Sequence, residues 1–159
     1  MAPIQLRKAT EHDRSTLLRF EQNLIEHERP FDPDLKTHDA LYYDMDFLLH
    51  SKQVHFVVAY NTTQADVPIA CGYVKRMPNA PKYTDPFHAY IGFMYTEPAY
   101  RGHGIAQQIL NELVTWSQAQ GMQQIILEVY QQNQNAVKAY EKVGFRPQIV
   151  QMRYTPNEK

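Results

Sequence analysis

The chain has 159 residues, a length that fits one domain, and a formal net charge of −1. That balance leaves no basic excess for a nucleic-acid surface, and no apolar run approaches the ~20 residues of a membrane span, so we expect neither partner. The single cysteine, Cys71, excludes an internal disulfide and suits a reducing, cytoplasmic location without a signal peptide. We expect Cys71 to be a small buried hydrophobe on a strand.

The first half of the chain has the pattern of one strand, two helices and three strands. A strand over 4–9 precedes a helix that a capping box of Thr10 and Asp13 opens and that continues to about Glu28. The prolines of "ERPFDPD" end this helix, because each disfavours helix for the residue before it. The remaining elements of this half are a helix over 41–50 and strands over 54–60, 69–77 and 88–96.

The second half has the pattern helix, strand, helix and strand. Apolar residues at helical spacing follow the loop 101–104, and Gly121 stands just past the end of that helix. The remaining elements are a strand over 123–130, a helix over 135–143 with a Schellman cap at Gly144 and Phe145, and a final strand over 146–154. This order predicts a mixed α/β fold in which an antiparallel meander leads into a strand–helix–strand crossover.

The stretch "YRGHGIAQQ" (Tyr100–Gln108) places an arginine and two glycines at the start of a helix. It lacks the lysine of a P-loop, and Gln107 stands where a dinucleotide fingerprint has its third glycine. Taken alone, this Gly-x-Gly is a strand-to-helix turn. However, the first N–H groups of a helix are unpaired and its dipole is positive there, so the site favours an anion. Gly102 and Gly104 permit close approach and Arg101 adds charge, which makes a diphosphate the natural occupant.

Two motifs identify a family resemblance. "EPAYRGHGIA" resembles the acyl-CoA-binding motif of the GNAT superfamily of N-acetyltransferases, Arg/Gln-x-x-Gly-x-Gly/Ala, with Arg101, Gly104 and Ala106 at its positions. "NQNAVKAYEKVGF" is similar to the second family segment, and its matching residues are Tyr140, Glu141, Lys142, Gly144 and Phe145. The resemblance implies one N-acetyltransferase domain over 1–159. Its fold would be a mostly antiparallel sheet with a central parallel strand pair splayed to hold acetyl-CoA, and helices on both faces.

The resemblance also implies where the expected co-substrate, acetyl-CoA, binds. The diphosphate would sit on backbone N–H groups of Arg101, Gly102, His103, Gly104, Ile105 and Ala106. The pantetheine arm would run beside main-chain groups of Met94, Tyr95 and Thr96, with Asn133 on the far side. One N–H near Tyr95 would polarise the thioester carbonyl. His103 is expected to be a solvent-facing loop residue, and the scattered histidines lack zinc spacing, so we expect no metal.

Catalysis in such an enzyme consists of positioning and proton handling. The resemblance makes Tyr140 the donor to the departing thiolate, since a tyrosine with a pKa near 10 stays protonated at neutral pH. Deprotonating a lysine-like amine at pH 7 costs about 4.6 kcal/mol, and an α-amine about 1.4 kcal/mol. Glu128, on the opposite side of its strand from Leu127, is the candidate base with Tyr90, and a structural role for Glu128 stays open. Glu97 is a weaker candidate.

The loop "HERPFDPD" borders the acceptor cleft in this fold. Glu28 and Asp32 would present carboxylates to a cationic amine and Phe31 an apolar wall, although a helix end followed by a solvated turn is the alternative. The leading hypothesis is an acetyl-CoA-dependent N-acetyltransferase that acts on a primary amine: a polyamine, a drug-like amine or a protein amino group. The alternative is a non-catalytic CoA-binding module. A homodimer is a further possibility, because this fold often forms one.

Overall fold

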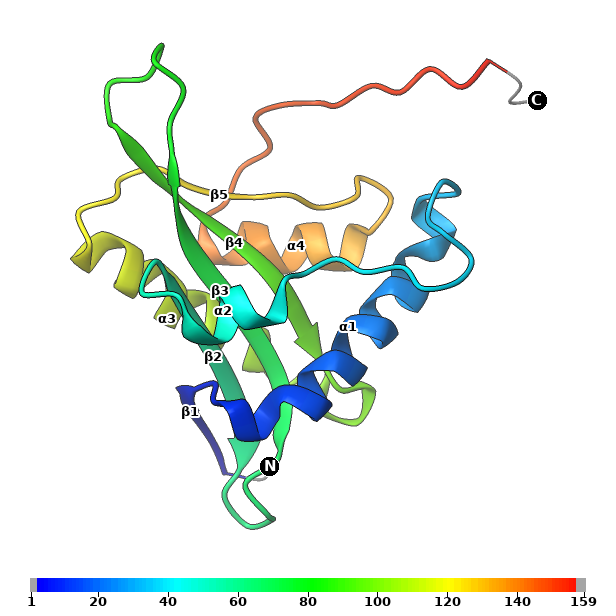
Figure 1. The fold of residues 1–159 in the computed structure, drawn as a ribbon, viewed down its shortest axis with the longest axis vertical. Helices are drawn as coiled ribbons and strands as arrows, with labels where there is room; N and C mark the ends of the chain where they lie inside the picture. The colour runs from blue at the N-terminus through cyan, green and yellow to red at the C-terminus, as the bar shows by residue number, and fades with distance from the viewer. Residues whose placement is uncertain (1–2, 157–159) are drawn as a thin grey trace.

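The computed structural model describes residues 3–156 (Figure 1). Its elements in chain order are strand β1 (Ile4–Lys8), helices α1 (Arg14–Glu28) and α2 (Met45–His50), strands β2 (Val54–Asn61), β3 (Pro68–Pro78) and β4 (Phe87–Thr96), helix α3 (Ile105–Ala119), strand β5 (Ile125–Leu127) and helix α4 (Gln134–Val143). None of the helices in the described range is long and apolar enough to cross a membrane. The predicted mixed α/β fold is therefore confirmed.

One five-stranded sheet in the order β1-β2-β3-β4-β5 divides the molecule into two layers. The first four strands are antiparallel neighbours, and β5 pairs parallel with β4 at one edge of the sheet. Helices α1 and α2 cover one face, and α3 and α4 cover the other (Figure 1). We call the two hydrophobic cores that result the α1 core and the α3 core. Alternation along β2 supplies both, because Phe56 and Val58 point into the α1 core while Val57 and Ala59 point into the α3 core.

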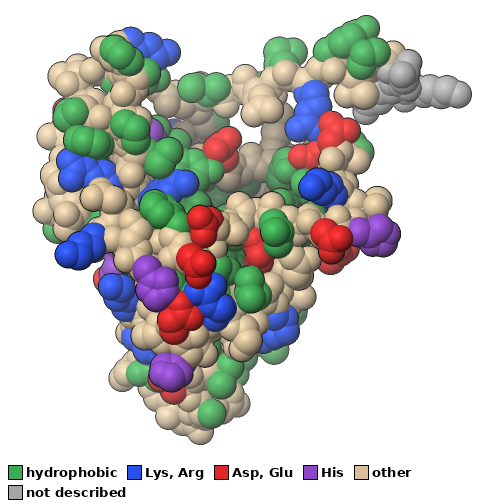
Figure 2. All heavy atoms as spheres, in the orientation of Figure 1, with side chains coloured by type: hydrophobic (Ala, Val, Ile, Leu, Met, Phe, Trp, Pro, Cys, Tyr) green, Lys and Arg blue, Asp and Glu red, His purple; other side chains and the backbone are tan. Residues whose placement is uncertain are grey.

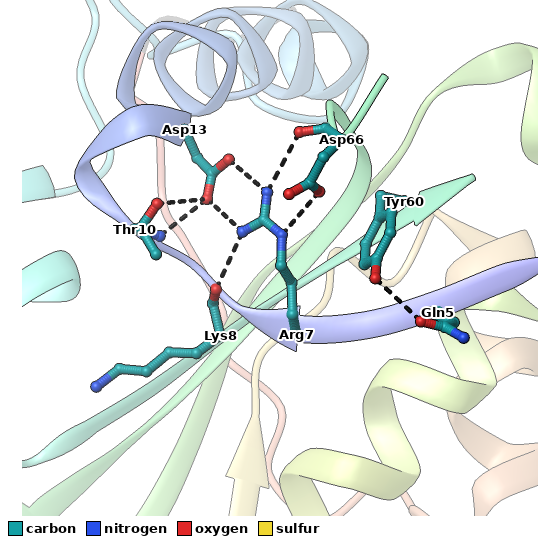
Figure 3. Close-up of polar contacts among 7 residues, drawn as sticks. All are labelled: Gln5, Arg7, Lys8, Thr10, Asp13, Tyr60 and Asp66. Atoms are coloured by element: carbon teal, nitrogen blue, oxygen red, sulfur yellow. Dashed lines mark hydrogen bonds and ion pairs between the residues drawn. The ribbon is translucent and has the colours of Figure 1, made fainter. Parts of the chain in front are cut away.

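The edge of the sheet at β1 is tied down by ionic hydrogen bonds (Figure 3). The Arg7 guanidinium donates to both carboxylate oxygens of Asp13 at 2.7 and 2.8 Å, and its Nε donates to Asp66 Oδ1 at 2.9 Å. The backbone N–H of Thr10 donates to the same Asp13 carboxylate at 2.8 Å, which completes the predicted capping box. Burial alone would raise the pKa of Asp13, but the hydrogen bonds from Arg7 and Thr10 hold that pKa below its ordinary value. This cluster joins β1, the start of α1 and the β2–β3 turn.

Strand β4 carries a bulge that reverses which of its residues face which core. Phe93 and Met94 stand opposite the single residue Gly72 of β3, and Phe93 adopts a φ of 54°, in the left-handed region. A side chain at Gly72 would bring its Cβ to 2.5 Å from Met94 Sδ, so this close approach requires glycine. Ile91, before the bulge, faces the α3 core, whereas Phe93 and Tyr95, after it, face the α1 core. The bulge therefore turns aromatic residues toward α1.

Three sequence predictions need correction in length or existence. The helix expected over 41–50 begins only at Met45, because Asp44 caps it by accepting from Phe47 N. The strand expected over 123–130 is paired only along Ile125–Leu127. The final strand expected over 146–154 is wrong, because that segment pairs with nothing in the described chain and runs as an extended, exposed trace (Figure 1). Its residues have strand propensity, but a strand forms only where a partner edge is hydrogen-bonded to it.

Candidate active site

The two parallel strands part immediately after a short paired segment. β5 pairs with β4 only where Ile125–Leu127 stands beside Ala89–Ile91. Beyond Ile91 the bulge redirects β4, and Figure 1 shows the two strands diverging. In the described chain no strand pairs with Met94–Thr96 on the β5 side. The backbone there is therefore open to an extended ligand, at the position where the sequence predicts the pantetheine track.

The glycine loop at the start of α3 has open space beside its backbone. Gly102 and Gly104 have φ values of 80° and 78°, which side-chain-bearing residues rarely adopt. A Cβ at either position would meet nothing within 4 Å, so the space above the loop is free of protein atoms. Gly104 is the N-cap of α3 and provides no side-chain cap, which leaves the first helical N–H groups facing that space. His103 is exposed on the loop. This arrangement fits an anion.

Arg101 joins the glycine loop to the end of β4. Its Nε donates to the Thr96 carbonyl at 2.9 Å, and its guanidinium carbon lies 5.8 Å from the centre of the Tyr95 ring. Arg101 is exposed, so its remaining N–H groups are accessible to a bound ligand. The side chain thus fixes the loop relative to the strand while keeping its charge beside the loop.

Tyr140 lies on α4, next to the end of that helix. Phe145 packs on it with ring centres 6.3 Å apart, and the Phe145 N–H donates to the Tyr140 carbonyl at 3.1 Å in the predicted Schellman cap. Burial raises the pKa of Tyr140 to about 12, and the negative charge of Glu28 adds to this effect. At the other end of α4, Asn133 is the N-cap and accepts from Ala136 N at 3.4 Å. Tyr140 is therefore protonated at neutral pH, and Glu28 lies near enough for its charge to act on the tyrosine.

Tyr90 and Glu128 form a hydrogen-bonded pair where the strands begin to part. The Tyr90 hydroxyl donates to Glu128 Oε1 at 2.7 Å. Burial, then this hydrogen bond, raises the pKa of Tyr90 above its ordinary value. Tyr90 packs against the α1 core whereas Leu127 packs against the α3 core, so Glu128 lies on the opposite side from Leu127. The exposed carboxylate of Glu128 is accessible to solvent.

The loop after α1 closes the outer wall of the cleft. The Phe31 ring lies 6.0 Å from the ring of Tyr130, which follows β5. The Tyr130 hydroxyl donates to Asp32 Oδ2 at 2.7 Å, and Arg153 Nη1 donates to Asp32 Oδ1 at 2.9 Å and Asp34 Oδ2 at 2.9 Å. Arg153 and Tyr130 lower the pKa of Asp32 to about 2. Both oxygens of this buried carboxylate are engaged, so Asp32 holds the wall together.

Glu28, the last residue of α1, is the carboxylate of this loop that faces the cleft. Burial raises its pKa, the hydroxyl of Tyr42 partly offsets that rise, and the charge of Asp32 adds to it. The charge of Glu28 in turn contributes to the raised pKa values of Tyr130 and Tyr140. Glu28 is therefore close to both Tyr130, in the loop after β5, and Tyr140, on α4.

The sequence pattern did not single out Glu21, which holds the segment before α2 against α1. The almost fully buried Glu21 accepts from the backbone N–H groups of Tyr42 and Tyr43 at 2.9 and 2.8 Å. These bonds hold the two tyrosines, which precede α2, against α1. A signal was present, because Glu21 stands four residues from both Leu17 and Ile25 on the apolar face of α1. A carboxylate at such a position indicates a buried hydrogen-bonded role.

Other candidates are already paired elsewhere. Glu97 accepts from Arg19 Nη1 at 2.8 Å, which joins the loop after β4 to α1. Glu11, Asp46 and His50 bring metal-ligand atoms together on the surface, but both carboxylates are paired with Arg14. Cys71 is fully buried, as expected, and its thiol donates to the Phe93 carbonyl at 3.4 Å.

The surface is hollowed between the β3–β4 hairpin and the loop after α1, with acidic and hydrophobic side chains on its rim (Figure 2). The acidic side chains around this hollow suit a cationic ligand.

Two curated N-acetyltransferases are similar to this chain over most of its length. N-alpha-acetyltransferase 30 of Saccharomyces cerevisiae is 28% identical over 142 residues, covering 89% of this chain and 79% of that protein. Thialysine N-epsilon-acetyltransferase of Sus scrofa is 26% identical over 149 residues, covering 92% and 86%.

Solved structures match the fold over almost the whole chain. A predicted acetyltransferase with acetyl-CoA from Clostridium acetobutylicum has a TM-score of 0.74 at 22% identity, covering 96% of each chain. The BH1408 protein from Bacillus halodurans has a TM-score of 0.83 at 19% identity, covering 95% of this chain and 98% of that one. Residues 21–145 match the model of the Acetyltransferase (GNAT) family. This chain belongs to the GNAT family of acetyltransferases.

Proposed function

We propose that this acyltransferase moves an acetyl group from acetyl-CoA to a primary amine by direct attack of the amine on the thioester. One observation carries the proposal: β5 pairs with β4 along three residues only, the glycine loop has open space beside its backbone, and Glu28 lies near enough to Tyr140 for its charge to raise the pKa of that tyrosine. This is the arrangement that two reactants need in order to meet end to end.

The donor site consists of the loop and the open end of β4. The main-chain N–H of Arg101, expected to bind the diphosphate, instead donates to the Pro98 carbonyl at 3.3 Å. The N–H groups of residues 102–106 therefore hold the diphosphate, and the charge of the Arg101 side chain supplements them. Main-chain groups of Met94–Thr96 and the side chain of Asn133 hold the pantetheine arm. The fit is supported by the empty space above both glycines and by the absence of a strand partner beside this part of β4 in the described chain.

The transfer step balances without a covalent enzyme intermediate. The amine nitrogen bonds to the thioester carbon, a backbone N–H near Tyr95 stabilises the oxyanion, and the carbon–sulfur bond then breaks. Tyr140, protonated because its pKa is about 12, donates a hydrogen bond to the departing sulfur. The nitrogen loses one proton as the amide forms and the sulfur gains one, so the products are the N-acetyl amine and CoA thiol. An acceptor that binds as ammonium first loses a further proton, which leaves to solvent.

The acceptor site selects a cationic amine and removes its proton. Glu28 attracts the ammonium form, and Phe31 with Tyr130 forms the apolar wall that Asp32 ties in place. Glu128, paired with Tyr90 where the strands part, receives the proton directly or through water. The names of the relatives span a protein α-amine and the side-chain amine of a small amino acid, so both belong among the acceptors to be tested.

The buried, unpaired Cys71 suits the reducing conditions of the cytoplasm, where we place the reaction. Release of CoA thiol, measured across a panel of peptide N-termini, lysine-like amines and polyamines, tests the function. Calorimetry with CoA tests the donor site separately. Binding without turnover on any amine would make the chain a non-catalytic CoA-binding module, and failure to bind CoA would exclude both functions.

A further inference from the structure

Lys75 holds a positive charge on the α1 side of the sheet without a carboxylate partner. It lies on β3 directly opposite Tyr90 of β4 and two residues after Tyr73, so its side chain is on the same side of the sheet as both tyrosines. Its Nζ lies 5.5 Å from the centre of the Tyr90 ring and 5.9 Å from the centre of the Tyr73 ring. None of the ion pairs within residues 3–156 includes this half-buried lysine.

Two carboxylates reach the same group of tyrosines. The Tyr90 hydroxyl donates to Glu128 Oε1 at 2.7 Å. The Tyr73 ring contacts the ring of Tyr43 edge to face, with ring centres 5.9 Å apart. Burial raises the pKa of Tyr43, and the charge of Glu28 adds to this effect. One cluster of aromatic rings is therefore bordered by an ammonium group and by both carboxylates of the proposed acceptor site.

An ammonium group in this position disfavours an acceptor that carries only positive charge, because like charges repel. The donor does not supply the missing anion. In the proposed reaction the diphosphate of CoA lies on the loop that begins α3, and α3 packs on the other side of the sheet. The favourable partner for the Lys75 ammonium is therefore an anionic group on the acceptor itself. Among primary amines, amino acids carry such a group as their carboxylate.

We propose that Lys75 determines acceptor specificity by binding a carboxylate of the acceptor, which makes a free amino acid the preferred substrate. The ammonium of Lys75 donates hydrogen bonds to that carboxylate, and Glu28 attracts the positive charge of the same molecule. Contacts with the Tyr73 and Tyr90 rings hold the lysine in place. The inference rests on the proposed acetyl transfer and narrows its acceptor from amines in general to zwitterions.

Thiol-release kinetics with lysine and lysinamide test this specificity, because the amide replaces the carboxylate by a neutral group. In the wild-type protein kcat/KM should be about 10-fold higher for lysine, and Lys75→Gln should remove this preference by raising KM for lysine. Any difference in basicity between the two acceptors is the same for both proteins, so the change in preference is the result that counts. Lys75→Arg should retain the preference, since a guanidinium also binds carboxylates.

Lys82→Gln is the matched control. Lys82 is an exposed lysine in the loop between β3 and β4, and its Nζ lies 5.2 Å from the centre of the Tyr83 ring. The variant should keep the preference for lysine over lysinamide. A peptide with an acidic side chain and its glutamine counterpart form a second pair of acceptors. A Lys75-dependent preference within that pair, with none between lysine and lysinamide, would overturn the free amino acid as acceptor.

Equilibrium binding separates a failure of this inference from a failure of the proposed function. NMR titration of the CoA-saturated protein with lysine and with lysinamide gives both Kd values without turnover. Weaker binding of lysine to Lys75→Gln, with the Kd for lysinamide unchanged, would support the carboxylate contact even if no amine were acetylated. Three results would overturn it: no binding of lysine, an equal Kd for lysine in both proteins, or an equal loss for both acceptors.

Discussion

The two edges of the sheet contrast sharply. At β1, five residues pair in register with β2, and Arg7 satisfies two carboxylates at once (Figure 3). At β5, only three residues pair with β4. The edge with satisfied hydrogen bonds stabilises the domain. At the β5 edge, no strand of the described chain pairs with the outer backbone groups of β5, and the candidate active site lies beside it.

This contrast explains how one small domain combines stability with open backbone. Unpaired strand edges invite association, and proteins normally cover or charge them. Here the unpaired stretch of β4 is reserved for the pantetheine arm in our proposal. Substitutions at the β1 edge should therefore change stability without activity, and substitutions near the parted strands should do the reverse.

The largest expected effect is on stability. Arg7→Ala leaves the buried Asp13 carboxylate without its cation and should lower the free energy of unfolding by about 3 kcal/mol, measured by urea denaturation. The value of kcat should stay unchanged. Arg14→Ala, which removes a more exposed ion pair, is the control and should cost much less. A loss of activity at intact stability would contradict the division between the two edges.

The ion pair of Arg7 and Asp13 should stabilise the fold less in acid. Because the pKa of Asp13 is lowered in the folded protein, its stabilising contribution is complete above the unfolded pKa of about 3.9 and is lost as pH falls through the folded value. The stability difference between wild type and Arg7→Ala should therefore shrink in acid, which urea titrations at several pH values will measure. A difference that is constant down to strongly acidic pH would exclude Asp13 as its source.

Tyr140→Phe should lower kcat about 100-fold while leaving the Kd for CoA within error, because only the hydrogen bond to the departing sulfur is removed. Thiol-release kinetics and calorimetry measure the two quantities. Tyr154→Phe removes a hydroxyl from the exposed C-terminal segment and is the control, with no expected change in kcat. Unchanged turnover in Tyr140→Phe on a good acceptor would remove Tyr140 from the mechanism.

Arg101→Ala should weaken CoA binding about 10-fold, since a charged donor beside the diphosphate is lost. Pantetheine, which lacks the diphosphate and nucleotide of CoA, sharpens the test. It should bind the wild-type protein and Arg101→Ala equally. An equal loss for both ligands would mean that Arg101 acts by holding Thr96 rather than by its charge.

The smallest expected effect distinguishes the two carboxylates. Glu28→Gln should raise KM for a cationic amine about 5-fold with kcat retained, whereas Glu128→Gln should lower kcat. Because the pKa of Glu28 is raised, its charge is lost as pH falls through a value above that of an ordinary carboxyl, so wild-type KM should rise there and the variant's should not. A lower kcat in Glu28→Gln together with a higher KM in Glu128→Gln would make Glu28 the base and Glu128 the amine-binding carboxylate.

Much of the site could be predicted because its signals are local. The glycine loop, the capping box of Thr10 and Asp13, and the Schellman cap at Gly144 each depend on a few neighbouring residues, and the structure confirms all three conformations. The sequence placed Asp32 at the acceptor loop but did not predict its bonds to Tyr130 and Arg153, because these partners stand about a hundred residues further on. Distant pairing of this kind leaves no periodicity to detect.

The sequence alone determined the helices, the turns and the family, because helical periodicity and positive-φ glycines are properties of short stretches. The tertiary structure decided which side chains face the cleft, since the bulge at Phe93 reverses the alternation that a regular strand would follow. It also decided the state of residues 146–154. Their composition favours a strand, but a strand must be hydrogen-bonded to a neighbouring edge, and in the described chain these residues are not.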